Sequence, residues 1–190
     1  MRLIHKFIVL ILLYTLLGWY IPVYAYKVKS VSDGGTITGK VVFKGRVPKR
    51  TIIPTRDKSV CGGMRKEPKI IVGKNKGVQE GFVYLQKVKQ GKAWPAQEST
   101  PVLDQKNCRF SPNVQIIRKG DIEILNSDPV LHNTHGYLCK KLGKQCKRTV
   151  FNLALPNQGQ TIKKKLKRPG TVKVDCDAHG WMLGWVQVVD

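Results

Sequence analysis

The sequence predicts an all-β protein built as a two-sheet antiparallel β-sandwich with Greek-key connections. From Gly34 onward, short runs of alternating apolar and polar residues are separated by Gly, Pro, Asn and Asp. Alternation with a period of about two residues is typical of half-buried strands, and a helical period of about 3.6 residues is lacking. Turn residues recur about every ten positions, which is the spacing found in sandwiches and barrels.

The expected strands can be placed from this alternation and from the turns between them. Within residues 171–176, Val172, Val174 and Cys176 are expected to face the core, because successive side chains of a strand point to opposite faces. Residues 44–68 are the least regular part of the chain, and residues 92–112 are expected to form a long loop. The full set of expected strands is 36–44, 69–72, 81–88, 113–118, 121–126, 131–138, 149–155, 160–166, 171–176 and 185–189.

The beginning of the chain has the composition of a secretory signal peptide. Arg2 and Lys6 precede an almost wholly apolar run over residues 7–19, and Val23 and Ala25 place small residues before a cleavage site. The apolar run is shorter than the roughly 20 residues that span a bilayer, although an uncleaved N-terminal anchor is the alternative. We therefore expect a signal peptide at 1–25, a single domain at 26–190, and a periplasmic or otherwise extracytoplasmic location.

An exported chain with five cysteines is expected to pair four of them and leave one free. Cys139 and Cys146 lie close enough in sequence to staple one loop, and Cys61 with Cys108 is the other favoured pair. The connectivity does not follow from the sequence alone, because four cysteines can pair in several ways. In this scheme Cys176 keeps its thiol.

The free cysteine belongs to a group of candidate metal ligands. Cys176, His179 and Met182 follow one another at three-residue spacing between two expected strands, and His132 precedes them on another strand. A thiolate, two imidazoles and a weak thioether are the ligands of blue-copper sites, with the methionine on the axis. His135 is the rival of His132, but on an extended strand it would point to the opposite face. The sequence predicts one copper ion, as Cu(I) or Cu(II), held by His132, Cys176, His179 and Met182.

These motifs resemble the cupredoxins, the family of type 1 blue-copper proteins that includes plastocyanin and amicyanin. The loop Cys-x2-His-x2-Met, the segment 126–133 that ends in His-Asn, and the tail after Met182 carry the resemblance, which covers residues 121–190. It implies a cupredoxin-like sandwich with its copper-site half at about 121–190. It also implies that Asn133 ties the two ligand loops together by hydrogen bonds. The N-terminal half looks like that of exported plastocyanin-like bacterial proteins.

The resemblance implies an exported protein that shuttles single electrons. The alternatives are a periplasmic copper carrier and a metal-free structural or interaction module with the same fold. Zinc fits three of the four ligands, but the methionine is a poor zinc ligand. Covalent haem is not expected, because Cys-x-x-Cys-His does not occur in the sequence. We expect no enzymatic activity, because no nucleophile with its base, phosphate loop or carboxylate dyad stands out. Trp181 is expected to shield the metal or to form an apolar docking rim around His179, whereas Trp185 is expected to pack.

The charge of the chain predicts anionic partners. It carries 34 Lys and Arg against 12 Asp and Glu, a net charge of +22, and loss of the signal peptide lowers this only to about +20. Because an exported protein rarely meets nucleic acid, we expect an acidic redox protein such as a cytochrome, or an anionic membrane surface. Two runs concentrate the charge, over residues 140–148 and 163–168. The oligomeric state does not follow from the sequence.

Overall fold

The computed structural model describes residues 26–85 and 88–190, so the expected signal peptide lies outside the described residues. Within these two ranges, no helix is both long and apolar enough to cross a membrane. The described chain divides into two compact units, and each is treated by itself below. The single domain expected at 26–190 stays a prediction.

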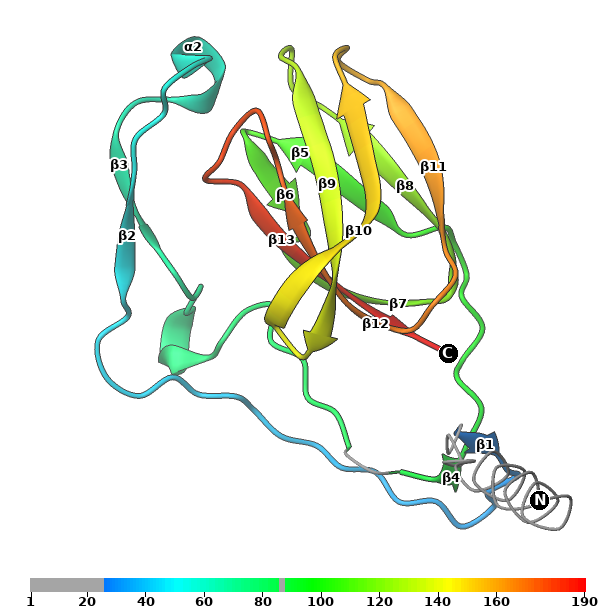
Figure 1. Ribbon diagram of the computed structural model, residues 1–190. Coiled ribbons are helices and arrows are strands. Elements are labelled where there is room, and N and C mark those ends of the chain that lie inside the picture. The colour runs from blue at the N-terminus through cyan, green and yellow to red at the C-terminus, as the bar shows by residue number, and fades with distance from the viewer. Residues whose placement is uncertain (1–25, 86–87) are drawn as a thin grey trace, which may run out of the picture. The chain divides into compact units, whose positions relative to one another are not determined.

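The larger unit, residues 37–83 and 96–190, contains a two-sheet β-sandwich (Figure 1). Its fold class is therefore the one predicted from the sequence. One sheet has the order β10 (Lys144–Leu155), β9 (His132–Lys141), β12 (Gly170–Asp175), β13 (Leu183–Val189) and β7 (Val114–Arg118). The other has the order β11 (Thr161–Leu166), β8 (Gly120–Asn126), β5 (Val102–Lys106) and β6 (Arg109–Ser111).

Alternating side chains from both sheets form the core. Val172 and Val174 on β12 are buried, as predicted, and Ile122 and Ile124 on β8 enter the same hydrophobic cluster. Neighbouring strands are mostly antiparallel, whereas β13 with β7 and β5 with β8 are parallel pairs. Sheet neighbours such as β9 and β12 are not consecutive in sequence, so the chain crosses repeatedly between the sheets. This crossing brings the ends of distant segments together.

An irregular region precedes the sandwich within the same unit. A hairpin of β2 (Lys49–Ile52) and β3 (Arg65–Pro68) has a short helix, α2 (Lys58–Cys61), between its strands. The disulfide Cys61–Cys108 joins this region to the sandwich, and Glu67 pairs with Arg109 at 2.6 Å. The hairpin is thereby fixed beside the end of the sandwich that carries the β5–β6 turn.

The smaller unit consists of residues 26–36 and 84–95, apart from residues 86–87. In it β1 (Lys27–Val28) runs parallel to β4 (Gln90–Gly91), and the Tyr26 hydroxyl donates to the Lys92 carbonyl at 2.7 Å.

Both expected disulfides are confirmed. Cys61 pairs with Cys108 at a Cα–Cα distance of 5.2 Å, and Cys139 pairs with Cys146 at 3.8 Å. Cys176 is free and buried. The second disulfide staples the turn between β9 and β10, where both strands are largely exposed.

Three of the expected strands are wrong in the described residues. Residues 36–44 and 69–72 make isolated bridges, Val42 with Gly77 and Val72 with Val78, and residues 81–85 form no strand. The alternation there has no sheet to bury it, and Ile37 is 84% exposed. A 3-10 turn, η1 (Lys74–Lys76), lies between the two bridges. Conversely, β5 and β6 lie where a loop was expected, because the inward position of β5 at Gln105 is polar.

Candidate metal centre

The four predicted ligands come from two places in the sandwich. His132 is the first residue of β9, and Cys176 follows directly after the last residue of β12. His179 and Met182 lie on the loop from β12 to β13, which Figure 1 draws in red. Because β9 and β12 are hydrogen-bonded neighbours, the start of one strand meets the end of the other. The sheet order therefore places the two segments side by side.

Three ligand atoms converge in the interior. The Cys176 Sγ lies 3.9 Å from His132 Nδ1 and 3.7 Å from His179 Nδ1, and the two Nδ1 atoms are 3.0 Å apart. All three side chains are buried. An ion about 2.0 Å from each nitrogen and about 2.3 Å from a sulfur in a trigonal plane gives S–N separations of about 3.7 Å and an N–N separation of about 3.5 Å. The S–N distances match this plane, and the N–N distance is shorter.

A buried carboxylate holds the outer nitrogen of His132. Asp128 Oδ2 lies 2.8 Å from His132 Nε2, and Asp128 also accepts the backbone N–H groups of Asn107 and Cys108 at 2.7 and 2.8 Å. Such a bond fixes the tautomer, with the proton on Nε2 and the Nδ1 lone pair facing the ion. Burial lowers the pKa of His132, and the hydrogen bond to Asp128 offsets this in part. The imidazole is therefore neutral near pH 7, as a metal ligand must be.

His179 has the same arrangement with a different carboxylate. Its Nε2 lies 2.9 Å from Asp57 Oδ2, although the two residues are 122 positions apart. Both Nδ1 atoms therefore present lone pairs toward Cys176 Sγ. Two nitrogen lone pairs and one thiol sulfur that face one another in a buried space are ligands that a metal ion would bind, so the donor set fits a bound metal ion.

The cysteine is held by the segment that also carries His132. The Asn133 backbone N–H donates to Cys176 Sγ at 3.4 Å, and the Asn133 side-chain oxygen accepts the Asp177 N–H at 3.3 Å. Asn133 thus ties the two ligand segments together, as the resemblance implied. Burial raises the pKa of the Cys176 thiol, and backbone hydrogen bonds lower it in part. The thiolate consequently needs a nearby cation to be stable at neutral pH.

Met182 lies in the same core as the cysteine. Its side chain is 2% exposed, and it belongs to the hydrophobic cluster that contains Cys176. The Met182 N–H donates to the His179 carbonyl at 2.9 Å, which closes a tight turn in the ligand loop. Its role as the axial ligand stays a prediction.

The turn before His132 is built by Asn126. Its side-chain N–H groups donate to the Val130 and Leu155 carbonyls at 2.8 and 2.9 Å, and its oxygen accepts the Asp128 N–H at 3.0 Å. This residue is fully buried at the end of β8. The bonds fix the path of residues 126–132, so they place Asp128 and His132 together.

The rival histidine lies outside the group. His135 Nδ1 is 3.0 Å from Asp177 and its Nε2 is 3.0 Å from the Thr149 hydroxyl, and its ring stacks on Tyr137. It occupies the outward side of β9, whereas His132 and Thr134 point inward. The two histidines thus lie on opposite faces of β9, as strand alternation predicted, and the choice of His132 as a ligand stays a prediction.

The aromatic residues near the site have different surroundings. The Trp181 ring centroid lies 5.0 Å from that of His179, and the indole N–H donates to the Cys108 carbonyl at 3.3 Å. Trp181 therefore shields the group. The expected docking rim around His179 is not formed, because Asp57 covers this imidazole and it has no exposed surface. Trp185 is half-buried on the outward side of β13, next to the buried Gly184 and Val186.

Two carboxylates of the site were not predicted from the sequence. Asp128 lies in the turn before His132 and is only 4% exposed, although the sequence analysis gave it no part in the site. Its position four residues before His132 is a signal that could have identified it. Asp57 lies in the least regular part of the chain, and no local pattern links it to His179.

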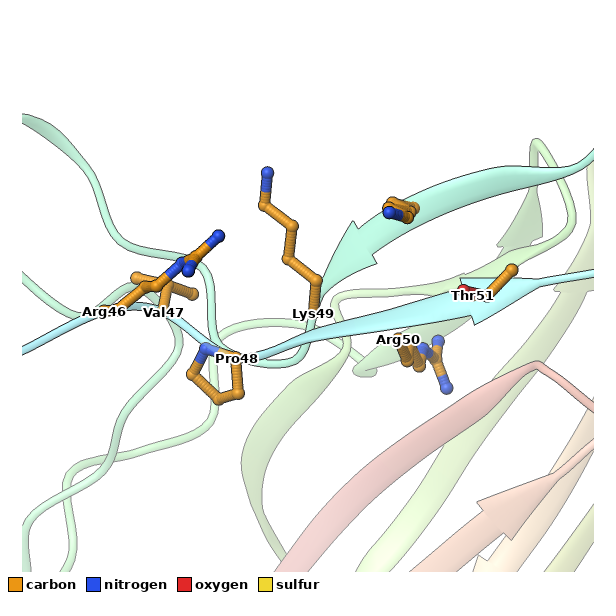
Figure 2. A pocket seen from close by; sticks show the side chains of 7 residues that line it. Arg46, Val47, Pro48, Lys49, Arg50 and Thr51 are labelled. Carbon is orange, nitrogen blue, oxygen red and sulfur yellow. The ribbon is translucent and has the colours of Figure 1, made fainter.

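Two hollows on the surface contain none of the predicted ligands. Figure 2 shows the first, a shallow pocket of about 320 Å³ lined by residues 46–51 and Lys66, in which Lys49 and Arg50 point to opposite sides of β2. The second, of about 400 Å³, lies at the stapled β9–β10 turn and is lined by Leu138, Lys140, Gln145, Lys147 and Arg148. Both are predominantly basic, unlike the closed interior that holds His132, Cys176 and His179.

Comparisons with known proteins identify no family for this chain. No family model and no curated protein matches it. Among solved structures, it is similar to a reduced tryptophan-to-tyrosine mutant of amicyanin, at 18% identity and a TM-score of 0.40, over 50% of this chain and 86% of that one. It is similar to amicyanin from Paracoccus versutus at 17% identity and a TM-score of 0.39, over 50% and 85% of the two chains. A copper-containing nitrite reductase from Thermus scotoductus matches at 18% identity and a TM-score of 0.38, over 52% of this chain and 24% of that one. Similarities this distant establish no shared activity, so the function has to be argued from the geometry of the centre.

Proposed function

We propose that this protein is an exported electron-transfer protein that holds one copper ion through His132, Cys176, His179 and Met182. The observation that carries the proposal is the convergence of one sulfur and two Nδ1 atoms in a buried space, with both outer nitrogens bonded to carboxylates. Copper is favoured over zinc because the neighbouring fourth residue is a methionine. The two disulfides suit an oxidising compartment outside the cytoplasm.

The protein residues would make electron transfer possible by holding the ligands still. When bound, copper supplies a one-electron couple. Asp128 and Asp57 orient the imidazoles, the Asn133 N–H bonds to the sulfur, and the strands β9 and β12 fix the spacing of His132 and Cys176. A dry, rigid donor set of this kind changes little between oxidation states. The chain acts in this proposal as an electron carrier and not as an enzyme.

Metal analysis with an optical spectrum tests the proposal. Wild-type protein produced with copper outside the cytoplasm is expected to contain one copper per chain, with a strong thiolate-to-copper absorption and a reversible potential. Cys176→Ser should lose the absorption, and His135→Ala should keep it as the matched control. A colourless protein that passes Cu(I) to an acceptor would point to a carrier, and a protein without copper would point to a metal-free module.

We further propose that a basic surface docks an acidic redox partner. The stapled β9–β10 turn places Lys140, Lys144, Lys147 and Arg148 on the surface, and β11 of the other sheet carries a second exposed group, Lys163 and Lys165. The disulfide Cys139–Cys146 holds the first group together around its hollow. Association with an acidic cytochrome is expected to slow steeply as the salt concentration rises. Rates that do not change with salt would contradict this, and binding to anionic vesicles would favour a membrane surface instead.

A further inference from the structure

The covering of His179 needs an explanation. This imidazole lies on a loop whose neighbouring residues Asp177 and Gly180 are exposed, yet its own exposure is 0%. The Trp181 ring covers part of it, and the Asp57 carboxylate bonds to its outer nitrogen. Asp57 belongs to residues 54–61, called the cap here. The His179 nitrogen that would otherwise face solvent is therefore covered by a segment that lies 122 positions away in the sequence.

Several bonds fix the cap in this position. Asp57 has a left-handed backbone with φ 51°, which few residues other than glycine adopt, and its carbonyl accepts the N–H groups of Val60 and Cys61. The helix α2 ends at Cys61, which is bonded to the fully buried Cys108. The Cys61 carbonyl also accepts the Arg65 guanidinium at 2.8 Å. The position of Asp57 is thus set by its own carbonyl and by the disulfide and hydrogen bonds of the residues that follow it.

The anchor of the cap also belongs to the hydrogen-bond network of the other histidine. The Cys108 N–H donates to Asp128 Oδ2, and the same oxygen bonds His132 Nε2. A single disulfide therefore connects the supports of both imidazoles. The Asp57 side chain remains 36% exposed, so it stands between the buried His179 and water.

We propose that Asp57 is a positioning residue for His179 and that the cap seals the copper centre at this imidazole. This inference rests on the proposed copper site. The carboxylate keeps the proton on Nε2, aims Nδ1 at the ion, and adds a negative charge that favours Cu(II) over Cu(I). The imidazole edge of His179 has no exposed surface, so it cannot itself be the point of contact with a partner.

The first test uses metal-free protein. Diethyl pyrocarbonate labelling read by mass spectrometry reports how accessible each histidine is. In the wild type, His179 and His132 are expected to react slowly. In Asp57→Ala, His179 alone should become several-fold more reactive, whereas Asp57→Asn should stay near the wild type, because its amide oxygen can still accept the Nε2 proton. Asp190→Ala is the matched control, since it removes one carboxylate at the far end of β13.

The second test uses copper-loaded protein. Chelator competition is expected to show a loss of copper affinity of about 10–100-fold for Asp57→Ala and a partial recovery for Asp57→Asn. The potential should rise in both variants, because both lose the negative charge, and should not change in Asp190→Ala. A folded Asp57→Ala with wild-type labelling, affinity and potential would overturn the inference and leave the copper proposal standing. If the wild type binds no copper, the proposed function fails, and unchanged labelling of His179 in metal-free Asp57→Ala would overturn the cap as well.

Discussion

At the scale of single residues, the centre depends on how each donor atom is aimed. His132 and His179 both use Nε2 for a carboxylate, which leaves Nδ1 for the interior. Cys176 has its sulfur within reach of both and receives the Asn133 N–H. An imidazole turned by half a rotation would lose both its carboxylate and its place beside the sulfur. Small polar contacts therefore decide whether the three donors can act together.

Replacing Asp128 is expected to damage both folding and metal binding. In Asp128→Ala, the buried Cys108 N–H, the His132 Nε2–H and the more exposed Asn107 N–H lose their acceptor, and each buried group left unpaired costs about 1–3 kcal/mol. Urea unfolding of the metal-free protein should show the loss. Asp121→Ala, at an exposed position of β8, is the control. Equal midpoints for the two variants would contradict the role of Asp128.

Gly136 is expected to tolerate no side chain. A Cβ at this position on β9 would lie 2.5 Å from two ring carbons of Phe151, which is itself buried. Gly136→Ala should therefore destabilise the fold by about 1–3 kcal/mol, because the ring has to move within a packed core. Gly39→Ala, where a Cβ meets nothing within 4 Å, should leave the thermal midpoint unchanged.

At the scale of elements, the hairpin of β2 and β3 is joined to the sandwich by charge as well as by the disulfide. Glu67 is buried and accepts from Arg65 at 2.7 Å and Arg109 at 2.6 Å, with Arg50 at 3.5 Å. Burial by itself raises the pKa of Glu67, but the hydrogen bonds and charges of Arg65 and Arg109 outweigh it, so the pKa is lowered. The carboxylate therefore stays ionised in the folded protein.

This lowered pKa predicts a stability that depends on pH. A group whose pKa is lower when folded stabilises the native state above its ordinary pKa, and the contribution disappears as pH falls through the folded value. Glu67→Gln is expected to cost about 1–3 kcal/mol at pH 7, and the difference from the wild type should vanish in strong acid. Denaturant unfolding over a pH series measures it, with the half-exposed Glu123→Gln as control. A constant difference at every pH would contradict the assignment.

The strands differ in how well the sequence predicted them. The strands from residue 113 onward alternate clearly and each joins a sheet with one face toward the core, so their positions and the inward direction of Val172, Val174 and Cys176 could be predicted. Residues 36–44 alternate as well, but they make only an isolated bridge and join no sheet. Alternation alone does not show whether a partner strand is present. The Asp57 contact could not be predicted, since a bond across 122 positions depends on the whole packing of the chain.

At the scale of the whole molecule, the two disulfides close loops of very different length. Cys61 and Cys108 are 47 residues apart, and Cys139 and Cys146 are 7 apart. In the chain-entropy account, the longer loop stabilises by about 4 kcal/mol and the shorter by about 2.5 kcal/mol. The long link also joins the cap to the sandwich, so its loss affects the centre too.

Replacing both cysteines of one disulfide by alanine, for each disulfide in turn, tests whether the longer loop stabilises the fold more. The double variant at Cys61 and Cys108 is expected to have the larger drop in unfolding free energy and a more reactive His179. The double variant at Cys139 and Cys146 should unfold more easily by a smaller amount and leave His179 unreactive. Calorimetry and histidine labelling measure the two effects. Equal labelling in both variants would show that the link does not hold the cap.

The covalent link between residues 61 and 108 also sets an order of events during maturation. In the proposed export of this chain, both of its cysteines leave the export machinery well before residues 176–182, so the cap can be tethered before the last three proposed ligands arrive. Copper that is supplied before the carboxyl-terminal ligand loop has folded meets an incomplete and open site. Copper that is supplied to the folded protein can enter only when the tethered cap opens. Metal uptake by the folded protein should therefore be slow, and metal release should be slow for the same reason.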